Sequence, residues 1–279
     1  MLIVDSQVHI WKANSPDRPW TPGLEPQLPE PLSIEGLIDQ MTGAGVDRVV
    51  IVPPHWEGLR NDYATEAFDR HPDRFRFMGR LNLERPDARA QLPGWMQQRG
   101  NLGMRQSFLS KHERNQLVNG AYDWLWEDAE RYRIPVMVHA ADLRTKVEKI
   151  VTRHPQLKLI LDHMGLSTAI AREGRFAEAA ENTVALARFP NVFAKLSSAP
   201  LHSREKYPFR DMHGYIHRIV DAFGPQRCFW GTDLSHMLHT CSYRDGVTLF
   251  TEELGLPAAD LEWIMGRGLC ACLGWPLPA

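Results

Sequence analysis

The residues Met1-Leu-Ile-Val-Asp5-Ser-Gln7-Val-His9-Ile-Trp11 open the chain and indicate the fold to expect. The apolar run 2–4 is typical of a strand buried in a sheet. Polar side chains able to bind a metal or move a proton follow at alternate positions, namely Asp5, Gln7 and His9. Because side chains alternate between the two faces of a strand, Gln7 and His9 are expected to point the same way. The stretch predicts a buried strand that ends in a site, although ordinary polar groups at a strand end would give the same pattern.

Length and composition limit the classes of protein to consider. The chain has 279 residues, which suits a single barrel domain over residues 1–279. Its net charge of -2 offers no basic field for nucleic acid and no polybasic patch for a membrane surface. No apolar run approaches the roughly 18 residues of a membrane span, the start does not resemble a signal peptide, and the four cysteines suit reduced thiols. We expect a cytoplasmic protein that acts on a small molecule; whether it forms a homo-oligomer stays open.

Segments of strand character alternate with segments of helical periodicity along the whole chain. After the first strand, strands are expected at 46–52, 74–82, 102–105, 134–139, 157–163, 191–197 and 228–233. Helices are expected at 33–44, 61–71, 87–98 with a break near Pro93, 121–132, 144–154, 175–188, 213–223, 243–253 and 261–273. Eight strands alternating with helices predict an α/β fold, a (β/α)8 TIM barrel with a parallel sheet. The alternative, a doubly wound sheet, would carry a Gly-rich phosphate turn after an early strand, and the sequence has none.

A proline-rich segment separates the first strand from the first helix. Residues 12–31 contain six prolines, which excludes a helix or a central strand. Long loops in compact domains are usually functional or disordered, so this one is expected to form a lid or wall. Trp11 and Trp20 are candidates to line that wall and to contact a ring-shaped substrate.

Polar residues recur at the predicted ends of several strands. They are Gln7, His9, Arg105, His139, His163, Lys195 and Asp233. In a TIM barrel these ends meet at one mouth, where active sites are built. Neutral imidazoles bind zinc or polarise a carbonyl, and a neighbouring carboxylate takes a proton from water. The set predicts hydrolysis, either with a metal that supplies hydroxide or with Asp233 as the base and histidines stabilising the oxyanion.

Other polar residues near these ends receive lesser roles. Asp162 precedes His163, so strand alternation predicts that it points toward the helices in a structural role. His236 follows Asp233 by three residues and is expected to line the pocket. His55, His202 and His239 lie in predicted loops on the same face; they are weaker candidates.

The motifs and their order resemble a known family. The motifs are Asp5-x-Gln7-x-His9-x-Trp11, Val138-His139, Leu161-Asp162-His163-Met-Gly165, Lys195-Leu-Ser197 and Trp230-Gly-Thr-Asp233-x-x-His236. They are similar to those of the amidohydrolase-related family, TIM-barrel hydrolases of the amidohydrolase superfamily. Within it, the chain most resembles the branch that includes sugar-acid lactonases and pyrone-dicarboxylate lactonase. The resemblance extends from the first strand to the eighth.

The resemblance implies roles for individual residues. His9 matches the second histidine of the family's strand-one His-x-His, and the strand-five and strand-six histidines correspond to His139 and His163. Asp233 matches the strand-eight aspartate, which binds metal or acts as general base. Arg105 lies where related lactonases place cations near a substrate carboxylate. Lys195 and Trp11 are grouped with the substrate-binding residues, without a firm role for Lys195.

Gln7 departs from the family pattern, which usually has histidine at this position. A neutral amide is a poorer zinc ligand than imidazole, so Gln7 is expected to donate a hydrogen bond to substrate instead. Two cofactor states therefore stay open. In one, a single divalent metal (zinc or manganese) is bound by His9, His139, His163 and Asp233; in the other, the enzyme is metal-free.

The leading prediction is an amidohydrolase-family hydrolase that opens a lactone of a small organic acid, with catalysis by Asp233, His163 and His139. One alternative is a metal-dependent decarboxylase of an aromatic or enoic acid. Another is a non-catalytic barrel that only binds a small ligand.

Overall fold

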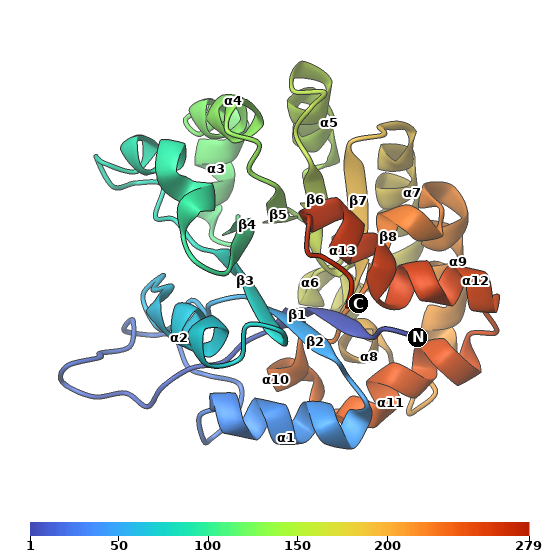
Figure 1. Ribbon diagram of the computed structural model, residues 1–279. Coiled ribbons are helices and arrows are strands. Elements are labelled where there is room, and N and C mark those ends of the chain that lie inside the picture. Colours follow the sequence, from blue (N-terminus) through green and yellow to red (C-terminus); the bar gives the residue numbers. More distant parts are fainter. Residues whose placement is uncertain (279) are drawn as a thin grey trace.

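Across residues 1–278, which the computed structural model describes, eight parallel strands form the centre of the molecule and helices surround them (Figure 1). Each strand pairs with the next in the order β1 to β8. The strands are β1 Val4–Val8, β2 Arg48–Ile51, β3 Phe75–Gly79, β4 Asn101–Ser107, β5 Val136–His139, β6 Leu159–Leu161, β7 Val192–Leu196 and β8 Cys228–Trp230. The expected α/β barrel is confirmed. Ala279, the last residue of the predicted domain, lies outside the described residues.

Helices follow the strands and cover the outside of the barrel. They are α1 Ile34–Ala44, α2 Asp62–Arg70, α3 Lys111–Asn119, α4 Asp123–Arg131, α5 Arg144–Arg153, α6 Thr168–Glu173, α7 Phe176–Val184, α8 Ala199–His202, α9 Arg210–Phe223, α10 Leu234–Met237, α11 Tyr243–Thr248, α12 Ala258–Glu262 and α13 Gly268–Leu273. Tighter 3₁₀ segments are Arg89–Gln97, Asp162–Gly165, Ala185–Arg188 and Pro225–Arg227, and wider π segments are Leu249–Glu253 and Trp263–Arg267. Within residues 1–278, no helix combines the length and the apolar character that crossing a membrane requires.

Several short helices were not predicted from the sequence, namely α3, α6, α8 and α10. Helix α3 begins with a capping box in which the Ser110 hydroxyl accepts from Glu113 N and the Glu113 carboxylate accepts from Ser110 N. The Ser-x-x-Glu spacing is visible in the sequence. The helix was missed because it is polar and has no clear apolar stripe. The predicted helix 87–98 is instead a 3₁₀ segment with Pro93 inside it, because proline cannot donate an α-helical hydrogen bond.

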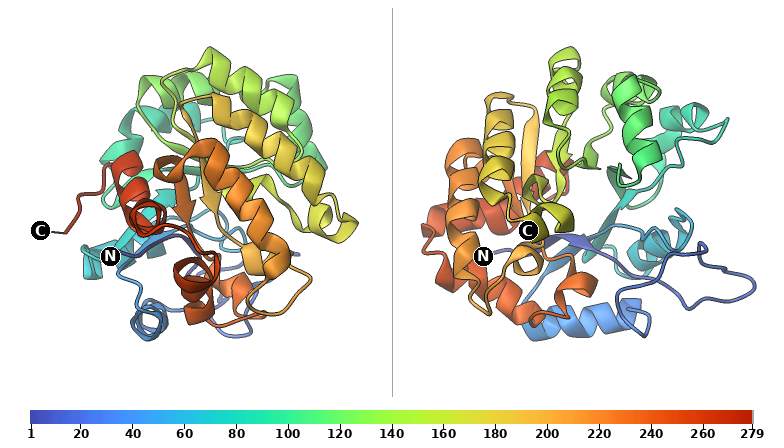
Figure 2. Two further views of the ribbon diagram at one scale, coloured as in Figure 1. Left: turned by 90° about the vertical axis from the view of Figure 1, so that its right-hand side faces the viewer. Right: turned by 180° about the vertical axis from the view of Figure 1, so that it is seen from behind.

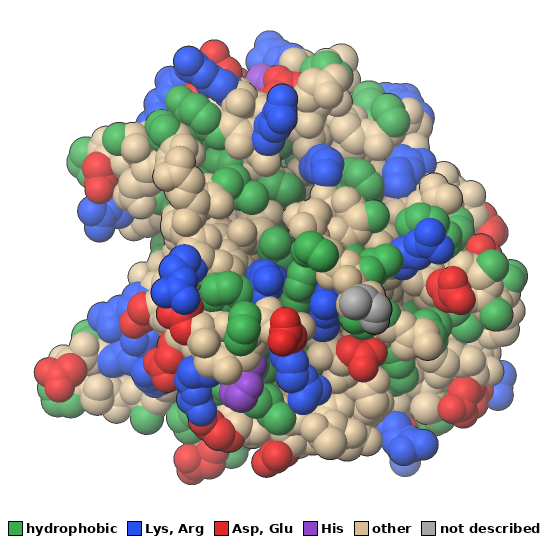
Figure 3. All heavy atoms as spheres, in the orientation of Figure 1, with side chains coloured by type: hydrophobic (Ala, Val, Ile, Leu, Met, Phe, Trp, Pro, Cys, Tyr) green, Lys and Arg blue, Asp and Glu red, His purple; other side chains and the backbone are tan. Residues whose placement is uncertain are grey.

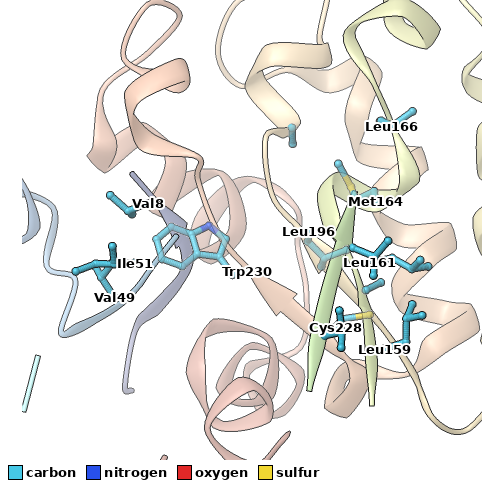
Figure 4. Close-up of a cluster of buried hydrophobic side chains, with 14 of the residues drawn as sticks. Val8, Val49, Ile51, Leu159, Leu161, Met164, Leu166, Leu196, Cys228 and Trp230 are labelled. Atoms are coloured by element: carbon cyan, nitrogen blue, oxygen red, sulfur yellow. The ribbon is translucent and has the colours of Figure 1, made fainter. Parts of the chain in front are cut away.

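The strands are buried on both faces, as in other parallel sheets. In β2, Val49 and Ile51 pack outward against the helices, whereas Val50 belongs to a second cluster in the barrel interior. Figure 4 shows part of the outward cluster, where Val8 lies near Val49 and Ile51. This double burial explains the continuous apolar runs in the sequence.

The C-terminal segments close one end of the barrel. Phe229 of β8 and Ile160 of β6 share the interior cluster with Leu269 and Leu273 of α13. The π segment Trp263–Arg267, directly before α13, packs on β8 and β1, and Figures 1 and 2 show these red helices beside the start of the chain. This end is filled with apolar side chains, which leaves the carboxyl ends of the strands for a site.

The last strand approaches the first without a regular ladder between them in the described part of the chain. Asp233 N donates to Gln7 O at 2.9 Å, just beyond β8. Gly231 allows this approach, because a Cβ at that position would collide with the Ser6 hydroxyl. The barrel is therefore nearly closed, with the predicted site residues of its first and eighth strands next to each other.

The proline-rich segment 12–31 projects from the barrel after β1 (Figure 1, lower left). It is held at its base, where Arg18 pairs with the buried Glu57 (Nε–Oε1 2.6 Å) and with Asp62. Figure 3 shows the surface hollowed at the left, between this segment and the one after β3.

Candidate active site

A cavity of about 690 Å³ opens at the carboxyl ends of the strands. Its walls include most of the predicted site residues, namely Gln7, His9, Arg105, His139, His163, Asp233 and His236. His55 and His202 also line it, whereas His239 does not. The sequence analysis did not single out Trp56, Arg80 and Ser198, which complete the polar and aromatic walls.

A shift of register in β1 separates Asp5 from the cavity. The pairing of β1 with β2 slips between Asp5 and Val8, so strict alternation does not hold there. Asp5 accepts hydrogen bonds from Thr232 N (3.0 Å) and from the Tyr243 hydroxyl (2.8 Å). Asp5 therefore ties β1 to the end of β8 and to α11, while Gln7 faces the cavity.

His9 is fixed in one tautomer by its backbone partner. Its Nδ1 lies 2.6 Å from Val52 O, and a carbonyl can only accept, so Nδ1 carries the proton. Burial lowers the pKa of His9, despite opposing contributions from Asp233. The neutral ring then directs the lone pair of Nε2 at Asp233 Oδ1, 3.3 Å away. A hydrogen bond from the other ring nitrogen to a backbone carbonyl orients metal-binding imidazoles in the same way.

Asp233 stands at the turn between β8 and α10, in the left-handed region with φ 59°. Its Oδ2 lies 3.1 Å from His236 Nδ1 and accepts a hydrogen bond from the Ser198 hydroxyl at 3.3 Å. Burial acts to raise the pKa of Asp233, but the charge of His236 and its hydrogen bond outweigh burial and hold the pKa well below the usual range. The carboxylate is therefore ionised at neutral pH.

Three of these residues fit a metal ion. One ligand atom each from His9, Asp233 and His236 lies within 4.8 Å of the others. Among residues 1–278, Asp233 Oδ1 receives no hydrogen bond, and it faces the lone pair of His9. A cation between two such acceptors would remove their repulsion. Tetrahedral zinc with ligands at ~2.0–2.1 Å places neighbouring ligand atoms roughly 3.3–3.4 Å apart, close to the 3.3 Å between His9 Nε2 and Asp233 Oδ1.

His163 reaches the cavity by a backbone turn that the sequence analysis did not foresee. Strand β6 ends at Leu161, and His163 then adopts φ 53°. Ile160 points into the barrel, so alternation also directs Asp162 inward. The prediction that Asp162 faces the helices is therefore wrong. The left-handed turn returns the ring of His163 to the cavity wall, where Ser198 Oγ lies 2.8 Å from Nδ1.

His139 is a second neutral imidazole beside His163. Their ring centroids are 5.1 Å apart in an edge-on arrangement. His139 Nε2 lies 3.2 Å from Leu166 O and donates to it. Burial lowers the pKa of His139 to about 4, with the charge of Arg105 acting in the same direction. Neither imidazole belongs to the cluster of His9, Asp233 and His236.

A buried ionic group supports this wall. Asp162 Oδ2 accepts from Arg105 Nε at 2.7 Å, and its Oδ1 accepts from Lys195 Nζ at 2.9 Å. Lys195 is fully buried, does not line the cavity, and also donates to Gln7 Oε1. The Lys195 ammonium is thus held by Asp162 and Gln7, and its expected contact with substrate stays a prediction.

Gln7 is oriented by the same lysine. Since its oxygen accepts from Lys195, its Nε2 is turned toward His9 Nε2, 3.4 Å away. Gln7 thus contacts the lone pair of His9 with a weak donor and does not present its oxygen to the metal cluster.

The aromatic wall also differs from the expectation. Trp11 is completely buried and packs edge-on against Trp56, with ring centroids 5.2 Å apart. Trp56 lines the cavity in its place and lies edge-on to His9 at 5.9 Å. Trp11 therefore supports the wall from behind.

TIM-barrel enzymes have their active sites at the carboxyl ends of the strands, where this barrel gathers its histidines and Asp233. A family model described as amidohydrolase matches residues 4–267, and the chain belongs to the amidohydrolase family.

Named relatives agree with this assignment. One is 4-sulfomuconolactone hydrolase from Hydrogenophaga intermedia, 26% identical over 204 residues; the match covers 72% of this chain but only 65% of that enzyme. Another is L-fucono-1,5-lactonase from Burkholderia multivorans, which is 25% identical over 295 residues. The match covers 100% of this chain and 98% of that enzyme. A solved amidohydrolase structure from Burkholderia multivorans with bound zinc shares the fold at a TM-score of 0.83 and 20% identity, covering 99% of this chain and 100% of that one.

Proposed function

We propose that the chain is a lactonase, which adds water across the cyclic ester of a small organic acid with the help of one divalent cation. The arrangement of His9, Asp233 and His236 carries the proposal, because it combines a fixed imidazole lone pair with a carboxylate oxygen that has no hydrogen-bond partner among residues 1–278. The two named relatives, a sulfomuconolactone hydrolase and a fucono-lactonase, support the lactone as the reacting group.

The ion would be held by His9, Asp233 and His236. Zinc suits two imidazoles and a carboxylate, and the zinc-bound barrel of similar fold supports it; manganese is the alternative. When bound, the ion supplies positive charge that polarises the lactone carbonyl and lowers the pKa of water. His139 and His163, predicted as further ligands, take other roles in this proposal.

The residues around the ion handle the protons. Asp233 accepts a proton from the attacking water, and it is ionised for this purpose at neutral pH. The water oxygen bonds to the carbonyl carbon, and the bond from that carbon to the ring oxygen then breaks. His163 Nε2, 4.0 Å from Asp233 Oδ2, would take this proton from Asp233 and pass it to the leaving ring oxygen. The neutral ring of His139 keeps His163 in place at the wall.

The test is an Asp233→Asn variant compared with Asp221→Asn, which removes an exposed carboxylate on α9. Asp233→Asn is expected to lower lactone turnover by roughly 10²–10⁴-fold while the protein stays folded. Asp221→Asn should leave turnover unchanged. Undiminished lactone hydrolysis by folded Asp233→Asn would contradict the proposal.

We also infer a reducing, cytoplasmic location. Cys228, Cys241, Cys270 and Cys272 are all free thiols, and three of them are buried. Reduced cysteines are usual in that compartment. Fractionation of the native host with an antibody to this chain tests the location.

A further inference from the structure

Arg80 follows β3 and lies in the wall between two cavities. It lines the 690 Å³ cavity of the candidate active site and an adjoining cavity of about 430 Å³. Only 3% of its surface is exposed.

Two of the three nitrogens of the Arg80 guanidinium have hydrogen-bond partners among residues 1–278. Its Nε donates to Pro53 O, and its Nη1 donates to His55 Nε2 at 2.9 Å. Within residues 1–278, Nη2 has no hydrogen-bond partner, and no carboxylate forms an ion pair with Arg80. The charge of Arg105 repels it, and the charges of Asp162, Glu113 and Asp233 oppose this effect without forming an ion pair with Arg80. A buried cation without a counter-charge is costly unless an anion joins it.

His55 orients this cation without neutralising it. Arginine has only donors, so His55 Nε2 must accept and the ring proton is on Nδ1. Burial, and then the charge of Arg80, lowers the pKa of His55, so the imidazole stays neutral. The Nη2 end of the guanidinium is buried in the cavity wall, where no group among residues 1–278 accepts a hydrogen bond from it.

Neighbouring charges do not satisfy Arg80. Glu113 lines both cavities, but its carboxylate caps α3 by accepting from Ser110 N at 2.9 Å. Asp162 is occupied by Arg105 and Lys195. Of the two arginines in the cavity wall, Arg105 is therefore neutralised and Arg80 is not.

We propose that Arg80, oriented by His55 and Pro53 O, binds a carboxylate of the substrate, and that the preferred substrate is a lactone bearing such a group. Two parallel N–H donors at the end of a guanidinium match the two oxygens of a carboxylate. The substrate class rests on the proposed lactonase function; the anion site itself does not.

The experiment compares Arg80→Gln with Arg99→Gln, which removes a cation whose side chain is 72% exposed. Two substrates are used: a carboxymethyl-substituted butenolide and its neutral carboxamide. Arg80→Gln is expected to lower kcat/KM for the acid by roughly 10- to 100-fold, chiefly through KM, and to leave the carboxamide unchanged. Arg99→Gln should affect neither substrate. Equal losses for acid and carboxamide would overturn the proposal and indicate a structural role.

A binding measurement separates the anion site from catalysis. Isothermal titration of wild type and Arg80→Gln uses glutarate, with neutral glutaramide as the reference. Glutarate binding that is lost in Arg80→Gln supports the site even if no lactone is hydrolysed, in which case only the proposed function fails. Lactone hydrolysis without discrimination between acid and carboxamide, or absent glutarate binding in the wild type, overturns the site.

Discussion

The buried ionic group behind the cavity leads to a quantitative prediction for Asp162→Asn. The substitution keeps the shape of the side chain but removes the charge that faces Arg105 Nε at 2.7 Å and Lys195 Nζ at 2.9 Å. Both cations are buried, with exposures of 4% and 0%. Removing one partner of a buried ion pair costs ~3–5 kcal/mol of stability.

Two features keep the expected loss for Asp162→Asn within this range, although two cations lose their partner. Burial already lowers the pKa of Lys195, so the lysine can release its proton in the variant. The asparagine oxygen also still accepts a hydrogen bond. A loss of ~3–5 kcal/mol is a large part of the roughly 5–15 kcal/mol that stabilises a typical protein. At about 2–4 °C per kcal/mol, Tm should fall by roughly 6–20 °C.

The dependence on pH adds a second check. Burial acts to raise the pKa of Asp162, but Lys195 and Arg105 outweigh it and lower the pKa below its value in the unfolded chain. A lowered pKa contributes stability above the unfolded-state value, about 3.9, and that contribution is lost as the pH falls through the folded value. The difference in unfolding free energy between wild type and Asp162→Asn should therefore have its largest value at pH 7 and should decrease below about pH 3.9.

The assay is urea unfolding followed by tryptophan fluorescence. The control is Asp69→Asn, which breaks a surface pair with Arg99 and should cost ~0.2–1 kcal/mol or less. If the free energy of unfolding fell no more in Asp162→Asn than in this control at pH 7, the buried ionic group would not contribute the expected stability.

Three further variants test the site. His236→Asn should weaken zinc binding and lactone hydrolysis by roughly 10- to 100-fold, whereas His217→Asn on α9 should change neither. A zinc affinity of His236→Asn equal to that of the wild type would exclude His236 as a ligand. Gln7→His should raise zinc affinity, measured by competition with a chromophoric chelator, because imidazole is the better ligand; unchanged affinity would count against a cluster next to Gln7. Ser198→Ala should lower kcat by about tenfold with little effect on Tm, since it removes a hydrogen bond to His163 and Asp233; a kcat equal to wild type would argue against this role.

The sequence predicted the barrel and its mouth because both follow from regular patterns. Apolar runs marked every strand, and polar residues at the strand ends indicated which side chains converge. His9 and Asp233 could be named as neighbours although they lie 224 positions apart, since a barrel places its first and eighth strands together.

The errors arose where the backbone departs from regular geometry. His163 adopts a left-handed conformation and so leaves the alternation of the strand, which lets Asp162 face inward as well. Composition does not reveal this feature, because positive φ at a histidine is set by its surroundings. Lys195 lies on a strand as expected, but only the structure shows that it is buried and held by Asp162.

The choice of metal ligands depended on a detail that no motif contains. Gln7 suggested weak metal binding or none, because a family ligand is absent. The structure places His236 beside Asp233, so this histidine can take the place of the missing ligand. The Asp-x-x-His spacing was visible, but which face of the short helix α10 meets the cavity was not.

The most direct test of the account is lactone hydrolysis measured on protein stripped with a chelator and then titrated with zinc or manganese. The stripped protein should be inactive, and activity should return in full at one equivalent of metal per chain. Full lactone hydrolysis by protein that contains no metal would contradict the proposed role of the ion.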